Sequence, residues 1–162
     1  ILEFAHSRGE APFVVIADGL TDPHNLGSIL RTANAAGAHG VIIPRNRSVS
    51  VTGTVAKVSA GAVEHIRVAR VTNIAQTLEQ LKKEGLWIVG TDLSAEQYHY
   101  DSDLKCALGI VIGSEGEGMS RLVREKCDFL VKIPMIGEIE SLNASVAAGI
   151  LLYEAVRQRR HE

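Results

Sequence analysis

The chain has little of several features that mark particular classes of protein. Aromatic residues make up only 4% of its 162 residues, which argues against binding of single-stranded nucleic acid by successive base stacking. No apolar run approaches the length of a membrane span, about 20 residues, and no signal-peptide pattern is present. The two cysteines, Cys106 and Cys127, form neither a disulfide framework nor a metal-ligand spacing. We therefore expect a protein of a reducing, cytoplasmic compartment.

An excess of positive charge is also missing. Seventeen Lys and Arg against nineteen Asp and Glu give a formal net charge of −2. Nucleic-acid-binding proteins usually carry a strongly basic surface, so any contact with RNA or DNA must come from local patches. Basic side chains do gather in two regions, at Arg45, Arg47 and Lys57 and at Arg157, Arg159 and Arg160. Without further evidence, an ordinary solvated face is the favoured explanation of each group.

What the chain does have is a globular composition, with 46% apolar and 22% charged residues. Apolar runs typical of strands occur at 13–17, 40–43, 68–71, 86–89, 108–112 and 129–133. Helical stretches lie between and after them at 25–36, 51–62, 74–84, 121–126 and 143–159, and a polar loop spans 92–103. Continuous Val, Ile and Leu runs indicate strands that are buried on both faces. The alternation predicts a single α/β domain with a parallel sheet covered by helices on both sides.

Ligands of open α/β sheets bind beyond the carboxyl ends of the strands, and the loops at these positions are informative. The loop after the first strand leads into a helix that carries Asn25 and Arg31. A helix cap and a solvated charge are the structural alternatives for these two residues. A later loop, 113–118, holds three glycines in six residues, which permits a tight turn and close backbone approach to a ligand. It matches neither a Walker A sequence nor the GxGxxG fingerprint, so a turn without a ligand is an equal alternative.

The last predicted strand ends at Ile133 and is followed by Met135, and the chain then passes through Ser141 and Asn143 into the terminal helix. Ser141 and Asn143 are both residue types that cap helices. The first ten residues of that helix, 144–153, are apolar on nearly every side. In a chain this small, such a helix favours a subunit interface over complete burial, and we expect a homodimer.

Together these loops are far more specific than any one of them. Three segments resemble, in order and spacing, the motifs of the SpoU/TrmH family of S-adenosylmethionine-dependent RNA ribose methyltransferases, in the SPOUT superfamily: NLGSILRTA at 25–33, LGIVIGSEGEGM at 108–119, and IPM at 133–135 with SLNASVA at 141–147. The resemblance extends over essentially the whole chain from about Phe13. Segments 22–27 and 57–62 are most similar to the subgroup that methylates a guanosine 2′-hydroxyl of 23S ribosomal RNA. A transfer-RNA ribose methyltransferase is the alternative within the family.

The resemblance implies a fold, a cofactor and partners. The fold is a parallel α/β sheet whose C-terminal segment is threaded into a trefoil knot, in an obligate dimer that acts on structured RNA. S-adenosylmethionine is the implied methyl donor, and because it already carries an excellent leaving group no metal is required. The implied donor-binding residues are Thr91, Gly113, Ile133, Met135 and Leu142. Residues 1–12 resemble the linker that follows an N-terminal RNA-binding domain, so we expect 13–162 to be the catalytic domain and that other domain to be absent from this chain.

The resemblance also implies a catalytic set: Asn25, Arg31, Glu115, Ser141 and Asn143. In the family, the residue matching Arg31 activates the ribose hydroxyl, sometimes as a general base. Because a guanidinium keeps its proton at neutral pH, we favour Arg31 as a cation that stabilises the developing alkoxide and grips a phosphate. Asn25 would orient Arg31 or the ribose, and Glu115 would pair with a basic group or hold the donor. Ser141 and Asn143 would position the target nucleotide.

Two functions of other classes are weaker alternatives. A nucleotide-dependent oxidoreductase could use the loop 113–118, but that loop lacks the GxGxxG spacing and follows a late strand. A non-catalytic RNA-binding module could retain the same fold. The presence of all five residues of the implied catalytic set argues against it.

Overall fold

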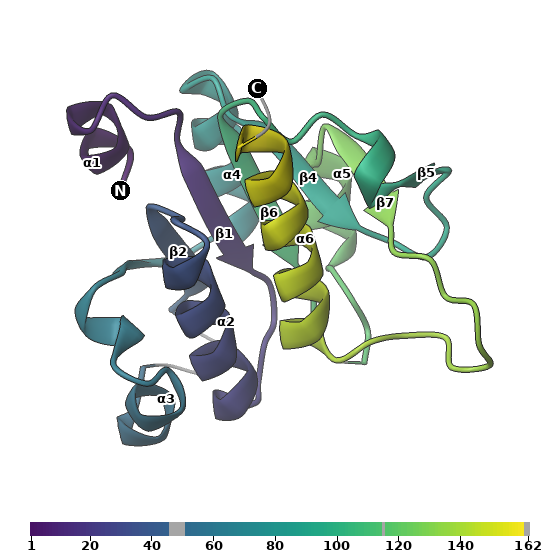
Figure 1. Cartoon of the computed structure of the whole chain (residues 1–162), viewed down its shortest axis with the longest axis horizontal. Coiled ribbons are helices and arrows are strands. Elements are labelled where there is room, and N and C mark those ends of the chain that lie inside the picture. The colour runs from purple at the N-terminus through teal and green to yellow at the C-terminus, as the bar shows by residue number, and fades with distance from the viewer. Residues whose placement is uncertain (46–50, 115, 161–162) are drawn as a thin grey trace.

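The computed structural model describes residues 1–45, 51–114 and 116–160 and shows a central sheet between two layers of helices (Figure 1). Seven strands of the described residues are hydrogen-bonded in the order β3-β2-β1-β6-β4-β7-β5, and all pairs are parallel. Their bounds are β1 Phe13–Ala17, β2 Gly40–Pro44, β3 Arg67–Val71, β4 Trp87–Thr91, β5 Gln97–Tyr98, β6 Leu108–Ile112 and β7 Phe129–Lys132. The predicted α/β class with a parallel sheet is confirmed.

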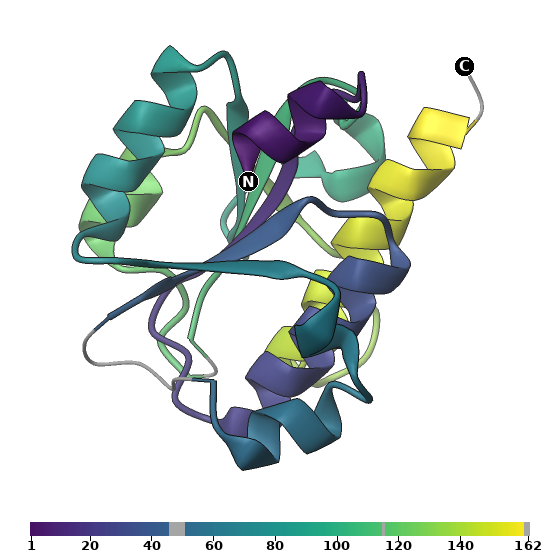
Figure 2. The same ribbon diagram turned by 90° about the vertical axis from the view of Figure 1, so that its left-hand side faces the viewer.

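Helices cover both faces of this sheet. Their bounds are α1 Leu2–Ser7, α2 Pro23–Ala35, α3 Gly53–Val58, η1 Ala62–Glu64, α4 Ile74–Lys83, η2 His99–Asp101, α5 Arg121–Lys126 and α6 Ala144–Arg160. Figure 2 shows α2 and α6 on one side of the strands and α4 and α5 on the other. Each face has its own core: along β1, Phe13 and Val15 belong to the cluster under α2 and α6, and Val14 and Ile16 to the cluster under α4 and α5. Strands buried on both faces explain the continuous apolar runs of the sequence.

Local signals in the sequence set most of the helix ends. Asn73 caps α4, because its side chain accepts a hydrogen bond from the backbone N–H of Gln76 at 3.0 Å. The predicted helix over 51–62 is divided into α3 and η1, because Ala60 and Gly61 adopt left-handed backbone angles, φ 52° and 86°, that an α-helix cannot accommodate. The predicted polar loop over 92–103 contains β5 and η2. β5 has only two residues and contains no apolar run. It is a strand because it pairs with β7.

The first twelve residues contain helix α1, to which the sequence analysis assigned no helix. No side chain caps α1, so the local sequence carries no start signal, and tertiary contacts hold it instead. The Phe4 ring packs edge-on against His39, whose centroid is 6.1 Å away. His39 is buried, accepts a hydrogen bond from the backbone N–H of Phe13 at 3.0 Å, and contacts the Glu10 carboxylate at 2.7 Å. The interpretation of residues 1–12 as a linker stays a prediction.

The order of the strands departs from the order of the chain at its C-terminal half. β6 lies between β1 and β4, although β4 and β5 precede it, and β7 then lies on the opposite side of β4. This order is consistent with the C-terminal knot that the resemblance implies, and the threading itself stays a prediction. In the described residues, no helix is both long and apolar enough to cross a membrane.

Candidate functional site

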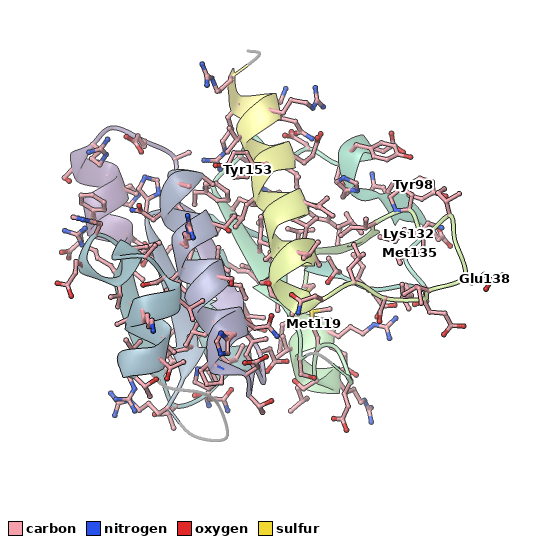
Figure 3. The ribbon with its side chains drawn as sticks, turned by 60° about the horizontal axis from the view of Figure 1, so that its bottom comes forward. Tyr98, Met119, Lys132, Met135, Glu138 and Tyr153 are labelled. Atoms are coloured by element: carbon pink, nitrogen blue, oxygen red, sulfur yellow. The ribbon has the colours of Figure 1, made fainter. Side chains whose placement is uncertain are left out.

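A cavity of about 360 Å³ opens where β4, β6 and β7 end. Its walls come from the segments that follow these three strands, from α5, and from the first turn of α6. The carboxyl edge of a parallel sheet is where ligands of α/β proteins bind. The volume falls within the range of pockets for small molecules and cofactors, about 300–1,000 Å³. Figure 3 shows Tyr98, Lys132 and Met135 at one edge of this region and Met119 near the start of α6.

The cavity brings together most of the predicted donor-binding residues. Thr91, Ile133, Met135 and Leu142 line it, although they come from three separate segments of the chain. Gly113 lies behind the lining rather than in it: a Cβ at this position would overlap the backbone of Gly118 and of its neighbour in the loop. Glycine at 113 therefore allows the loop after β6 to fold back over the end of its own strand.

The glycine-rich loop is closed by hydrogen bonds between its two ends. The backbone N–H of Ser114 donates to the carbonyl of Gly118 at 3.0 Å, and that of Gly118 donates to the carbonyl of Ser114 at 3.2 Å. Gly118 has φ 72°, which favours glycine. Just beyond the loop, the backbone N–H of Ser120 donates to the Asp18 carboxylate at 2.8 Å, which connects the loop to the end of β1. The predicted catalytic residue Glu115 lies outside the described residues.

The residues predicted at the start of α6 have different local roles. Asn143 caps the helix, because its Oδ1 accepts hydrogen bonds from the backbone N–H of Ser145 at 2.9 Å and of Val146 at 3.4 Å. The cap predicted at Ser141 is not formed in the described structure, because α6 begins at Ala144 and the nearer carboxamide of Asn143 occupies its first turn. Ser141 is exposed and lines the cavity instead.

Asn25 and Arg31 lie on α2, outside the lining of the cavity. The helix starts at Pro23, two residues earlier than predicted, and Asp22 caps it by accepting a hydrogen bond from the N–H of the residue two positions on. Asn25 is therefore inside the first turn, where it is 3% exposed, and is not the cap. Arg31 is exposed. Because α2 packs along α6, the segments that carry the first and third motifs are neighbours.

One wall of the cavity carries an ion pair, between Asp92 and Arg124, that was not predicted from the sequence. Arg124, on α5, places its Nε 3.2 Å from Asp92 Oδ2, and its Nη2 donates to the Ser94 hydroxyl at 3.0 Å. Burial alone would raise the pKa of Asp92, but hydrogen bonds from Ser94 and the Arg124 guanidinium outweigh it, so the pKa lies below its ordinary value. Asp92 was detectable by its place directly after a strand end, whereas nothing in the sequence pairs it with Arg124.

The floor beside this wall is apolar and chemically inert. A Cβ at Gly90 would overlap the side chains of Met119 and Cys127, so the absence of a side chain in β4 makes room for both. Burial raises the pKa of the Cys127 thiol to about 12, which keeps it protonated and unreactive at neutral pH. Among the described residues, no group of three or more His, Cys, Asp or Glu side chains could hold a metal ion.

The comparisons with known proteins agree with this geometry. Residues 12–153 match the SpoU rRNA Methylase family, and the chain belongs to that family. It is 61% identical over 155 residues to YacO of Bacillus subtilis, which is assigned to the TrmH family of tRNA/rRNA methyltransferases; the match covers 96% of this chain and 62% of YacO. A Staphylococcus saprophyticus protein of the same assignment is 61% identical over 148 residues, 91% of this chain and 59% of that protein. The chain thus spans about 60% of the length of these curated relatives.

Solved structures with the same fold extend the comparison. The SpoU methyltransferase AviRb of Streptomyces viridochromogenes, in complex with AdoMet, superimposes with a TM-score of 0.88 at 34% identity, over 94% of this chain and 62% of AviRb. The TrmH/SpoU tRNA modifying enzyme of A. aeolicus gives a TM-score of 0.86 at 32% identity, over 94% of this chain and 77% of the other.

Proposed function

We propose that this chain is a catalytic domain that transfers a methyl group from S-adenosylmethionine to a ribose 2′-hydroxyl of structured RNA. The observation that carries the proposal is the cavity at the carboxyl edge of the sheet, where Thr91, Ile133, Met135 and Leu142 converge. The AdoMet complex of AviRb, which has the same fold at 34% identity, supports the choice of donor. The assignment of YacO as a tRNA/rRNA methyltransferase supports RNA as the acceptor.

The cavity fits a donor of this kind. Its lining combines apolar side chains such as Leu142 and Met135 with a polar rim from Asp92, Arg124 and Ser141, as a nucleoside joined to an amino acid requires. The two ends of the loop 113–118 lie close together because a glycine occupies each of them. When bound, S-adenosylmethionine supplies an electrophilic methyl group on a good leaving group.

The chain's own residues would prepare the acceptor. Arg31, exposed on α2, would contact an RNA phosphate and stabilise the negative charge that develops on the ribose oxygen. Asn25, buried six residues before it, would fix the local arrangement of the helix and of the ribose. Ser141 lies at the cavity rim, where its hydroxyl would position the nucleotide. Holding two reactants in line can supply about 7–11 kcal/mol of a reaction barrier.

For the acceptor we propose a guanosine of 23S ribosomal RNA. The segments 22–27 and 57–62 carry the resemblance to that subgroup. The first lies at the start of α2 and the second runs from the end of α3 to the start of η1, and both α3 and η1 pack against α2. A transfer RNA is the second candidate, and the similarity to the A. aeolicus tRNA modifying enzyme favours it. Methyl transfer from labelled donor to 23S fragments and to tRNA transcripts, followed by mapping of the modified ribose, tests the choice. Labelling of base atoms instead of a 2′-oxygen would contradict the proposed reaction.

We also propose that the domain works as a homodimer in the cytoplasm. One side of α6 is buried against α2 and the sheet, with Ala148 and Leu151 fully covered, so burial explains part of its apolar character. Val146 and Tyr153 remain about half exposed on the same helix. Positions seven residues apart lie on the same face of a helix, so the two side chains contribute to one exposed apolar patch, which favours a protein interface. Sedimentation of the chain at micromolar concentration, with a Tyr153→Glu variant for comparison, tests this proposal.

A further inference from the structure

One cation of the cavity has no ion-pair partner among the described residues. Among the residues that the structure describes, four ionisable side chains line the cavity: Asp92, Glu117, Arg124 and Lys132. Asp92 and Arg124 neutralise each other, because the guanidinium of Arg124 lies 3.2 Å from the Asp92 carboxylate. Glu117 is exposed. Lys132 is only partly exposed, and in the described part of the chain the lysines that form ion pairs are Lys82 and Lys126.

The position of the Lys132 ammonium is fixed by an aromatic side chain. Tyr98 in β5 and Lys132 in β7 are register partners, so their side chains lie on the same face of the sheet. The Lys132 Nζ lies 4.8 Å from the centroid of the Tyr98 ring, within the range of a cation–π contact. The Tyr98 ring in turn stacks on Tyr100, with centroids 5.3 Å apart and planes inclined by 14°. Figure 3 shows Tyr98 and Lys132 together beside Met135.

This contact leaves the ammonium able to bind an anion. A lysine ammonium has three N–H donors and no acceptor. Contact with the face of one ring does not engage all three donors, so at least one N–H can still donate to an anion. The ring also removes side-chain freedom in advance, so that less entropy is lost when an anion binds. A partly buried cation held in this way at the wall of a cavity selects a negatively charged group of the ligand.

We propose that Lys132, held by Tyr98, binds the carboxylate of the methyl donor's amino-acid moiety. The inference rests on the proposed function, because S-adenosylmethionine carries one anionic group, its carboxylate, together with a positive sulfonium and a positive ammonium. The Lys132 charge attracts the first and repels the other two. The amino-acid end of the donor therefore lies with its carboxylate toward the β5–β7 edge of the cavity. Lys132 is a binding residue that sets the orientation of the donor.

Two ligands that differ only in the carboxylate test this directly: S-adenosylmethionine and decarboxylated S-adenosylmethionine. Calorimetric titration of the wild-type chain is expected to show about tenfold tighter binding of the carboxylated compound. In Lys132→Met the affinity for S-adenosylmethionine should fall about tenfold, whereas that for the decarboxylated compound should not fall. Lys132→Arg should retain the preference. Lys83→Met, which removes an exposed lysine of α4 that does not line the cavity, should leave both affinities unchanged.

Substitution of Tyr98 and variation of the salt concentration test the same preference for the carboxylated ligand independently. Tyr98→Leu removes the ring and should reduce the preference about two- to fivefold, whereas Tyr98→Phe should preserve it. The wild-type preference should also shrink as salt concentration rises, which needs no variant. Equal loss of affinity for both ligands in Lys132→Met, or no wild-type preference, would overturn the inference. A folded wild-type chain that binds neither ligand would overturn the proposed function itself.

Discussion

The two ends of the parallel sheet use polar residues in opposite ways. At the amino end of β1, His39 is 3% exposed and both of its ring nitrogens have partners, the N–H of Phe13 at 3.0 Å and the Glu10 carboxylate at 2.7 Å. At the carboxyl end, Lys132 and Ser141 face a cavity. Polar groups that satisfy one another stabilise the fold, whereas polar groups that face a cavity are available to a ligand. His39 at the amino end thus contributes to stability, whereas Lys132 and Ser141 at the carboxyl end face a cavity that can receive a ligand.

The largest expected effect is on catalysis, at Arg31. Arg31→Ala should slow methyl transfer by about 10²–10³-fold or more, because it removes the cation that we propose stabilises the developing alkoxide. Donor affinity should be nearly unchanged, since Arg31 does not line the cavity. Single-turnover methylation of RNA and calorimetry with the donor measure the two effects. Arg121→Ala, at an arginine whose side chain is 90% exposed on α5, is the control. Near-normal turnover in Arg31→Ala would remove Arg31 from the mechanism.

The next largest effect is expected at the glycine behind the cavity. Gly113→Ala places a Cβ against the backbone of Gly118, and relief of that overlap should cost about 1–3 kcal/mol and displace the loop. Donor binding should weaken by about tenfold or more. Gly53→Ala is the matched control, because a Cβ there meets nothing within 4 Å. Unchanged donor affinity in Gly113→Ala would show that the conformation of this loop does not affect donor binding.

At the amino end of the sheet, a substitution should reduce the stability of the protein and leave donor affinity unchanged. His39→Ala leaves the buried N–H of Phe13 without its acceptor and should lower the free energy of unfolding by about 1–3 kcal/mol. Donor affinity at the far end of the sheet should not change. Urea unfolding and donor titration measure both quantities, with the exposed His6→Ala as control. Loss of donor affinity at unchanged stability would break the contrast between the two ends.

The smallest expected effect is a pH dependence at Asp92. Its pKa is lower in the folded protein than the ordinary value, so its ionised form adds stability above the unfolded-state pKa. That contribution, less than about 1 kcal/mol for a partly exposed pair, is lost as the pH falls through the folded-state pKa, below about pH 4. Wild-type stability should therefore decline more steeply than that of Asp92→Asn between neutral and strongly acidic pH. Asp101→Asn, at an exposed carboxylate, should follow the wild type.

Sequence reasoning recovered those parts of the molecule that local patterns determine. Continuous apolar runs located the long strands, and the family resemblance supplied Thr91, Ile133 and Leu142, which lie together at one edge of the sheet. β5 was missed because its two residues become a strand only by pairing with β7. The Asp92–Arg124 pair was missed because the two residues are far apart in the chain and are joined only by tertiary packing. Helix α1 likewise depends on contacts with His39 rather than on its own sequence.

The central claim is that the cavity at the carboxyl end binds a methyl donor. Its most direct test is calorimetric titration of the chain with S-adenosylmethionine, with its demethylated product and with NAD. The account predicts saturable binding of the first two at about one site per chain, abolished or strongly weakened in Gly113→Ala and retained in Arg31→Ala, and no heat with NAD. A folded chain that binds neither methyl compound would contradict the claim.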